Sequence, residues 1–203
     1  MQHHRVLGLD PAIKNYGYSM LEIREDLTAW RIIECGLVQN PINEIAENLR
    51  DSLDKYSFEM RRMIQVWRPA DVVIERFQNR SRVGASQTEK VNIMIGLAAY
   101  MADVASCNVH AITAAQWKNK VNAKADLDAI YTTTRTYMRD YCKSRNHSKA
   151  QRDTLVGKVP HSVDSTILGL LIGCQRSGID PFSFINTNVA NKVVKALTEG
   201  YTL

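Results

Sequence analysis

The spacing of apolar and polar residues at the beginning of the chain predicts three strands. Apolar and β-branched runs at residues 6–9, 16–23 and 29–38 are typical of strands, and a short polar segment joins the last two. Pro11 has no backbone N–H and forces an extended residue before it, so the first strand should end at Asp10. Connections this short predict an antiparallel meander.

The remainder of the chain alternates helical and strand patterns. Apolar residues at three- and four-residue spacing predict a helix over residues 43–67, which Pro69 ends. The compact apolar run 71–75 is typical of a buried parallel strand. After it we expect a helix at 86–105, a strand at 108–112, helices at 114–120 and 126–142, a polar loop at 143–159, an apolar helix at 160–174 and a final helix at 189–197.

This order of elements predicts the fold class. Strands separated by helices should run parallel to the first strand, whereas the meander is antiparallel. We therefore expect an α/β fold with a mixed five-stranded sheet and helices on both faces. Residues 1–203 should form a single domain, because 203 residues of which 45% are hydrophobic suit one core and would be cramped as two.

Composition narrows the cellular setting. The chain has no stretch of about 18 uncharged apolar residues, so we expect no membrane span. Its four cysteines are far apart and form no C-x-x-C pair, which favours reduced thiols over structural zinc or disulfides. We expect a cytoplasmic protein, in the host cytoplasm if it is phage-encoded, with an organelle as the open alternative.

Positive charge is concentrated in one segment. The net charge is +5, and residues 118–158 contain ten Lys or Arg but only four Asp or Glu. The rest of the chain is nearly neutral, so a phosphate-rich partner should contact this segment. The alternative is a solvated helical face that happens to use basic residues, and the charge alone does not decide between them.

Three acidic residues occupy positions that the fold would bring together. Asp10 ends the first strand and Glu75 ends the fourth, so parallel strands would deliver both to one edge of the sheet. Asp164 lies in the first turn of a late helix, three residues after His161, and residues three apart share a helix face. Clustered carboxylates repel one another unless a cation neutralises them, and oxygen ligands suit Mg²⁺ or Mn²⁺.

Each of these residues also has a simpler interpretation. Asp10 before a proline is typical of a turn, and Glu75 could be a surface residue after a buried strand. Asp164 near a helix start is favoured by the helix dipole, and His161 could cap or pack. For each residue taken alone, the simpler interpretation is favoured over a catalytic role. Only the order and placement of all four residues favour an active site.

Three motifs, in order over roughly residues 5–174, resemble the RuvC-type Holliday junction resolvases. They are Val6-Leu7-Gly8-Leu9-Asp10-Pro11 with Tyr16-Gly17-Tyr18, Val72-Val73-Ile74-Glu75 with Phe77, and Pro160-His161-Ser162-Val163-Asp164-Ser165 with Ile167-Leu168-Gly169-Leu170. One departure is Ala12, where the family usually has glycine after Asp-Pro. A second is the segment 118–159, which looks expanded and basic, as in a phage- or organelle-type variant.

The resemblance implies an RNase H-like fold and a homodimer that cuts four-way DNA junctions with a divalent metal. Asp10, Glu75 and Asp164 would be the metal ligands, and His161 would be the fourth catalytic residue. We expect two Mg²⁺ ions in each active site, for which Mn²⁺ should substitute, and products with a 5′ phosphate. The apolar positions 91, 95, 98 and 102 could pair two subunits or belong to the core.

The same resemblance suggests residues that contact DNA. Phe77 approximately matches a junction-probing aromatic residue, with a core phenylalanine as the alternative. Lys118, in Ala115-Gln116-Trp117-Lys118, resembles a basic residue that approaches the scissile strand. The remaining candidates are the basic residues Arg80, Arg82, Lys120, Arg145, Lys149 and Arg152.

Other functions remain open at this point. An RNase H-like nuclease acting on flaps, other branched DNA or RNA–DNA hybrids would use the same carboxylates. A catalytically inactive DNA-binding module is a further alternative, which the intact Asp10, Glu75 and Asp164 disfavour. An actin-like or sugar-kinase ATPase also starts with a strand-end aspartate, but it normally needs two lobes, and the chain has no G-x-x-x-x-G-K-[ST] loop.

Overall fold

A computed structural model describes residues 3–12, 14–24, 30–39, 49–77, 85–120, 124–158 and 161–176. Five strands form one sheet in the order β3-β2-β1-β4-β5. The strands are β1 (His3–Asp10), β2 (Asn15–Arg24), β3 (Trp30–Gln39), β4 (Asp71–Arg76) and β5 (Asn108–Thr113). β1, β2 and β3 pair antiparallel, whereas β4 runs parallel to both β1 and β5. The predicted mixed five-stranded sheet is therefore confirmed.

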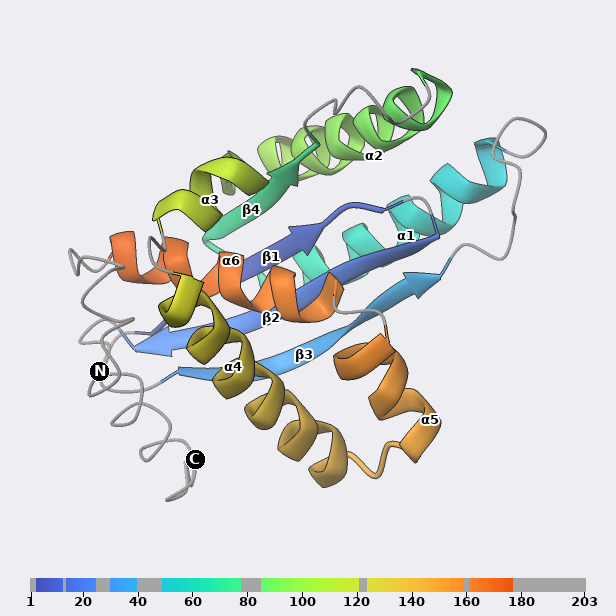
Figure 1. The fold of residues 1–203 in the computed structure, drawn as a ribbon. Coiled ribbons are helices and arrows are strands. Elements are labelled where there is room, and N and C mark those ends of the chain that lie inside the picture. The colour runs from blue at the N-terminus through green and yellow to red at the C-terminus, as the bar shows by residue number, and fades with distance from the viewer. Residues whose placement is uncertain are drawn as a thin grey trace.

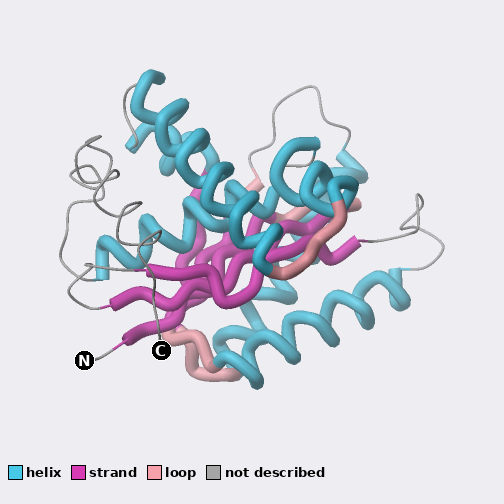
Figure 2. Tube along the Cα trace, turned by 90° about the horizontal axis from the view of Figure 1, so that it is seen from below, coloured by secondary structure: helices cyan, strands magenta, loops and turns pink. Residues whose placement is uncertain are grey.

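Helices cover both faces of the sheet (Figures 1 and 2). They are α1 (Leu49–Trp67), α2 (Ala85–Val104), α3 (Ala114–Lys120), α4 (Lys124–Ser144), α5 (Lys149–Arg152), the π-helix η1 (Asp153–Lys158) and α6 (His161–Arg176). α1 and α2 pack on one face, where Tyr56, Met60 and Met94 share a core with Leu7 and Ile74. α4 and α6 pack on the other face around a second buried cluster.

Parts of two predicted helices lie outside the residues that the structure describes. The structure begins α1 at residue 49, and the predicted residues 43–48 lie outside the described part, as do residues 189–197. Arg68 ends α1 because it adopts a positive φ of 46°, and its N–H still donates to Ile64. Pro69 follows it and cannot continue a helix.

The loop expected over residues 143–159 is wrong. α5 and η1 occupy most of that segment, on the same side of the sheet as α4 (Figure 1). Ser148 and Gln151 form a capping box, in which the Ser148 side chain accepts from the Gln151 N–H and the Gln151 side chain accepts from the Ser148 N–H. The spacing S-x-x-Q is a helix-start signal that the high local polarity obscures.

Candidate active site

The four predicted catalytic residues come together at one edge of the sheet. Leu9 of β1 lies beside Ile74 of β4 in parallel register, so Asp10 and Glu75 leave the two strands at the same level. His161 and Asp164 are in the first turn of α6, which crosses β1 and β2. The predicted meeting of these residues is therefore what the structure shows.

Glycines in the sheet allow α6 to approach this closely. A Cβ atom on Gly8 would overlap the backbone of Ser165, and one on Gly17 would overlap the backbone of His161. Gly17 lies opposite Asp10 in the β1–β2 pair. The two glycines in the first motif thus give His161 and Asp164 access to Asp10.

Polar contacts fix α6 at both ends. His161 Nδ1 lies 2.6 Å from Asp10 Oδ2 at the beginning of the helix. At its other end the guanidinium of Arg176 donates to the buried Asp71 at 2.5 Å, and Asp71 also contacts His110. Because Asp71 starts β4, this second contact sets the position of α6 along the sheet.

The acidic residues influence one another electrostatically. Burial, together with the negative charge of Asp10, raises the pKa of Glu75 to about 7. Burial also raises the pKa of Asp164, and Asp10 contributes in the same direction. The hydrogen bond with Asp10 raises the pKa of His161 above its usual range. Burial is thus the main cause of the raised pKa values of Glu75 and Asp164, and the negative charge of Asp10 adds to it.

Two aromatic residues that sequence reasoning missed hold the carboxylates. The indole N–H of the fully buried Trp117 donates to Glu75 Oε2 at 2.8 Å. The hydroxyl of Tyr131, on α4, donates to Asp164 Oδ1 at 2.6 Å. A buried tryptophan needs a partner for its N–H, so Trp117 carried a weak signal in the sequence. Tyr131 carried none, because its partner Asp164 lies 33 residues further along the chain.

Among the predicted DNA-contacting residues, Lys118 belongs to this site. Its positive charge lowers the pKa values of both Glu75 and Asp164, and its Nζ lies 4.8 Å from the centre of the Trp117 ring. Phe77 directly follows β4, is half-buried and belongs to neither core cluster. The proposed contact of Phe77 with DNA stays a prediction.

The other predicted DNA-contacting residues lie elsewhere in the chain. Lys120 ends α3, and Arg80 and Arg82 lie outside the described residues. Arg145 is exposed between α4 and α5, and Lys149 is exposed at the start of α5. Arg152 is partly buried and donates to the backbone of His147, so one of its hydrogen-bonding positions is already used.

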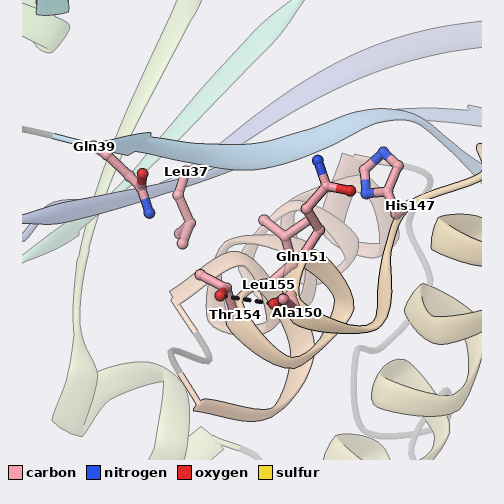
Figure 3. A pocket seen from close by; sticks show the side chains of 7 residues that line it. All are labelled: Leu37, Gln39, His147, Ala150, Gln151, Thr154 and Leu155. Atoms are coloured by element: carbon pink, nitrogen blue, oxygen red, sulfur yellow. Dashed lines mark hydrogen bonds between the residues drawn. The ribbon is translucent and has the colours of Figure 1, made fainter.

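A pocket of about 380 Å³ lies elsewhere, between the end of β3 and the α5–η1 segment (Figure 3). It is lined by Leu37, Gln39, His147, Ala150, Gln151, Thr154 and Leu155. None of the four predicted catalytic residues lines this pocket. The pocket is therefore separate from the acidic edge of the sheet.

A mixed sheet of this order, with acidic residues at the carboxyl ends of β1 and β4 and on α6, has the RNase H-like fold. Two structures of RuvC from Thermus thermophilus, one in complex with a Holliday junction substrate, superpose with TM-scores of 0.58 and 0.61. The sequence identities are 17% and 18%, over 86% of this chain and 96% of theirs. The yeast mitochondrial Holliday junction resolvase gives a TM-score of 0.50 at 14% identity, over 93% of this chain and 84% of its own.

Sequence comparison gives a shorter match. The crossover junction endodeoxyribonuclease RuvC of Synechococcus sp. (strain CC9605) is 27% identical over 73 residues. Those residues are 36% of this chain and 44% of that relative. No protein-family model matches the chain. The comparisons therefore establish the RuvC-like fold.

Proposed function

We propose that this protein is a structure-selective DNA endonuclease that resolves four-way junctions by metal-dependent phosphodiester hydrolysis. The observation that carries the proposal is the meeting of Asp10, Glu75 and Asp164 at one sheet edge, with His161 bonded to Asp10. The fold supports it, because the similar Thermus thermophilus protein was solved with a Holliday junction. The expected products are nicks with a 5′ phosphate and a 3′ hydroxyl.

The donor chemistry of the site fits a hard divalent cation. Three carboxylates supply oxygen ligands, and a bound cation would offset the burial and the Asp10 charge that raise the pKa of Glu75. In the described residues, no three His, Cys, Asp or Glu side chains stand as a finished metal cage, and each carboxylate has a protein hydrogen-bond partner. Metal binding would therefore require these carboxylate side chains to rearrange.

We assign the metal to Mg²⁺, with Mn²⁺ as a substitute and two ions in each site. Asp10, Glu75 and Asp164 would hold them. When bound, such ions activate water for in-line attack and stabilise the leaving 3′ oxygen. His161 keeps Asp10 oriented through its Nδ1, and Lys118 adds positive charge beside Glu75 and Asp164.

The DNA backbone would lie across the basic segment next to the site. Lys118 is at the acidic edge, and Arg145 and Lys149 are exposed on the same side of the sheet as α4. Lysine and arginine neutralise phosphates without reading the sequence, which suits recognition of a branched shape. Lys120, Arg152, Arg80, Arg82 and Phe77 remain proposed DNA contacts.

A homodimer would present two equivalent sites to the two equivalent strands of a junction. Of the two interpretations of the apolar positions 91, 95, 98 and 102, the core one fits the structure, because Val91, Ala98 and Ala102 are buried within the subunit. The opposite face of α2 carries the exposed residues Ile93, Gly96, Tyr100 and Val104. We therefore propose that this exposed face of α2 forms the subunit interface.

Cleavage of a panel of substrates tests this function. A synthetic four-way junction should be cut faster than a flap, a duplex or an RNA–DNA hybrid in Mg²⁺. Asp10→Asn should cut none of them while still binding the junction. Preferential cutting of flaps or hybrids would support the alternative nuclease, and binding without cutting in the wild type would support an inactive DNA-binding module.

No helix in the described part of the chain is both long enough and apolar enough to cross a membrane.

A further inference from the structure

Tyr131, in the amino-terminal half of α4, connects this helix to the active site. Tyr131 donates its hydroxyl to Asp164 Oδ1 at 2.6 Å. This short distance is typical of a hydroxyl donating to a charged carboxylate, which is a stronger bond than a neutral one. Asp164 is thereby held by a residue from a different element, 33 positions earlier in the chain.

The rest of α4 is fixed to the sheet by the same kind of residue. The Tyr137 hydroxyl accepts from the Ile32 backbone N–H at 3.3 Å, and the Tyr141 hydroxyl donates to the Ile33 carbonyl at 3.2 Å. Met138, between them, is fully buried. α4 is thus anchored on β3, and this rigid attachment determines where Tyr131 stands.

The ring of Tyr131 is also held in place. The Arg135 guanidinium lies over it, with its Cζ 5.3 Å from the ring centre, and the Trp117 ring is 6.5 Å away. Trp117 itself donates to Glu75. Two neighbouring aromatic donors therefore hold two of the three carboxylates, and Tyr131 is the one that comes from the expanded basic segment.

We infer that Tyr131 is a positioning residue, which orients Asp164 for binding the divalent cation. Its hydroxyl donates to Oδ1, so Oδ2 is the oxygen that would bind the ion. Hydrogen-bond partners of metal ligands fix the orientation of those ligands, and removing such partners typically weakens metal affinity or activity about 10–100-fold. This inference rests on the proposed function for its metal, but it concerns a residue to which the resemblance assigns no role.

Tyr131→Phe removes only the hydroxyl and keeps the ring against Arg135 and Trp117. Tyr141→Phe is a matched control, because it removes a hydroxyl of the same helix that bonds to a backbone carbonyl instead of a carboxylate. Both variants should fold, and thermal unfolding would report any general loss of stability. Only Tyr131→Phe should change the response to metal.

Two measurements separate this role from a structural one. Binding of Mn²⁺ to the free protein, followed by electron paramagnetic resonance, should weaken about 10-fold in Tyr131→Phe and stay unchanged in Tyr141→Phe. In junction cleavage, the Mg²⁺ concentration for half-maximal rate should rise by a similar factor, with the rate at saturating Mg²⁺ close to wild type.

Equal metal affinities in the two variants would overturn the inference, as would a loss of rate that saturating Mg²⁺ does not restore. If the wild type binds Mn²⁺ but cuts no junction, the proposed function fails, and the Mn²⁺ comparison still decides the role of Tyr131. If the wild type cuts and Tyr131→Phe responds to Mg²⁺ as the wild type does, only the inference fails.

Discussion

His161 and Asp10 are 151 residues apart in the chain, yet their side chains form a 2.6 Å hydrogen bond at the carboxyl end of β1. Gly17, opposite Asp10, makes this contact possible because it has no side chain where the backbone of His161 passes. Asp164 lies one turn further along the same helix. The first and last motifs of the chain are therefore two halves of one packed unit.

Substitution of Gly17 should disturb that unit directly. Gly17→Ala forces a methyl group into the backbone of His161, so we expect a loss of about 1–3 kcal/mol in unfolding free energy and a strong loss of cleavage. Urea denaturation measures the first effect. Gly157→Ala is the control, since a Cβ atom there meets nothing within 4 Å. Equal stabilities of the two variants would contradict the packing described for α6.

The raised pKa of Glu75 predicts how stability depends on pH. Its folded-state pKa of about 7 is above its ordinary value of 4.5, so the folded protein binds an extra proton between these values and loses stability as pH rises through that window. Glu75→Gln keeps an acceptor for Trp117 without the charge. The metal-free variant should therefore be more stable than wild type at pH 8, by up to about 3 kcal/mol, and little different at pH 4.5.

Thermal unfolding in a chelator at several pH values measures this difference. The melting temperatures of the wild type and of Glu75→Gln could instead differ by the same amount at every pH from 4.5 to 8. That result would show that the folded protein does not raise the pKa of Glu75. Added Mg²⁺ should stabilise the wild type more than the variant at pH 8, because binding to the folded state alone raises stability.

Salt dependence tests the basic segment. Each phosphate contact that is lost should reduce the slope of log affinity against log salt by about 0.9 for duplex arms. We expect the joint substitution of Lys118, Lys120, Arg145 and Lys149 by glutamine to flatten the slope by two to four such steps, measured by fluorescence anisotropy with a labelled junction. Lys55→Gln, on α1 at the opposite face, should leave it unchanged. An unaltered slope in the quadruple variant would assign these residues to solubility.

If the exposed face of α2 is the subunit interface, charged substitutions on that face should separate the subunits. Tyr100 is 67% exposed and Val104 is 66% exposed, so charges placed there disturb no core. Tyr100→Asp with Val104→Asp should convert a dimer to a monomer in sedimentation equilibrium at micromolar concentration, while the melting temperature of the subunit changes little. Phe58→Asp, on α1, is a control with a similarly exposed side chain. A double variant that stays dimeric would place the interface elsewhere.

The sequence was sufficient for the sheet and for the acidic edge, because both depend on local patterns. Asp10 and Glu75 each end an apolar run, and parallel pairing brings them level. The high polarity of the segment after α4 predicts a loop, although its Ser148–Gln151 spacing is a helix-start signal. Tyr131 could not be found in this way, since its partner Asp164 is joined to it only by the packing of α4 and α6.

The central claim is that Asp164, with Asp10 and Glu75, forms the metal-dependent centre of a junction-resolving endonuclease. The most direct test is cleavage of a synthetic four-way junction in Mg²⁺ by the wild type and by Asp164→Asn, with junction binding measured in parallel. We predict paired nicks with ligatable ends from the wild type, and no cleavage but intact binding from the variant. Cleavage by Asp164→Asn at the wild-type rate would contradict the claim.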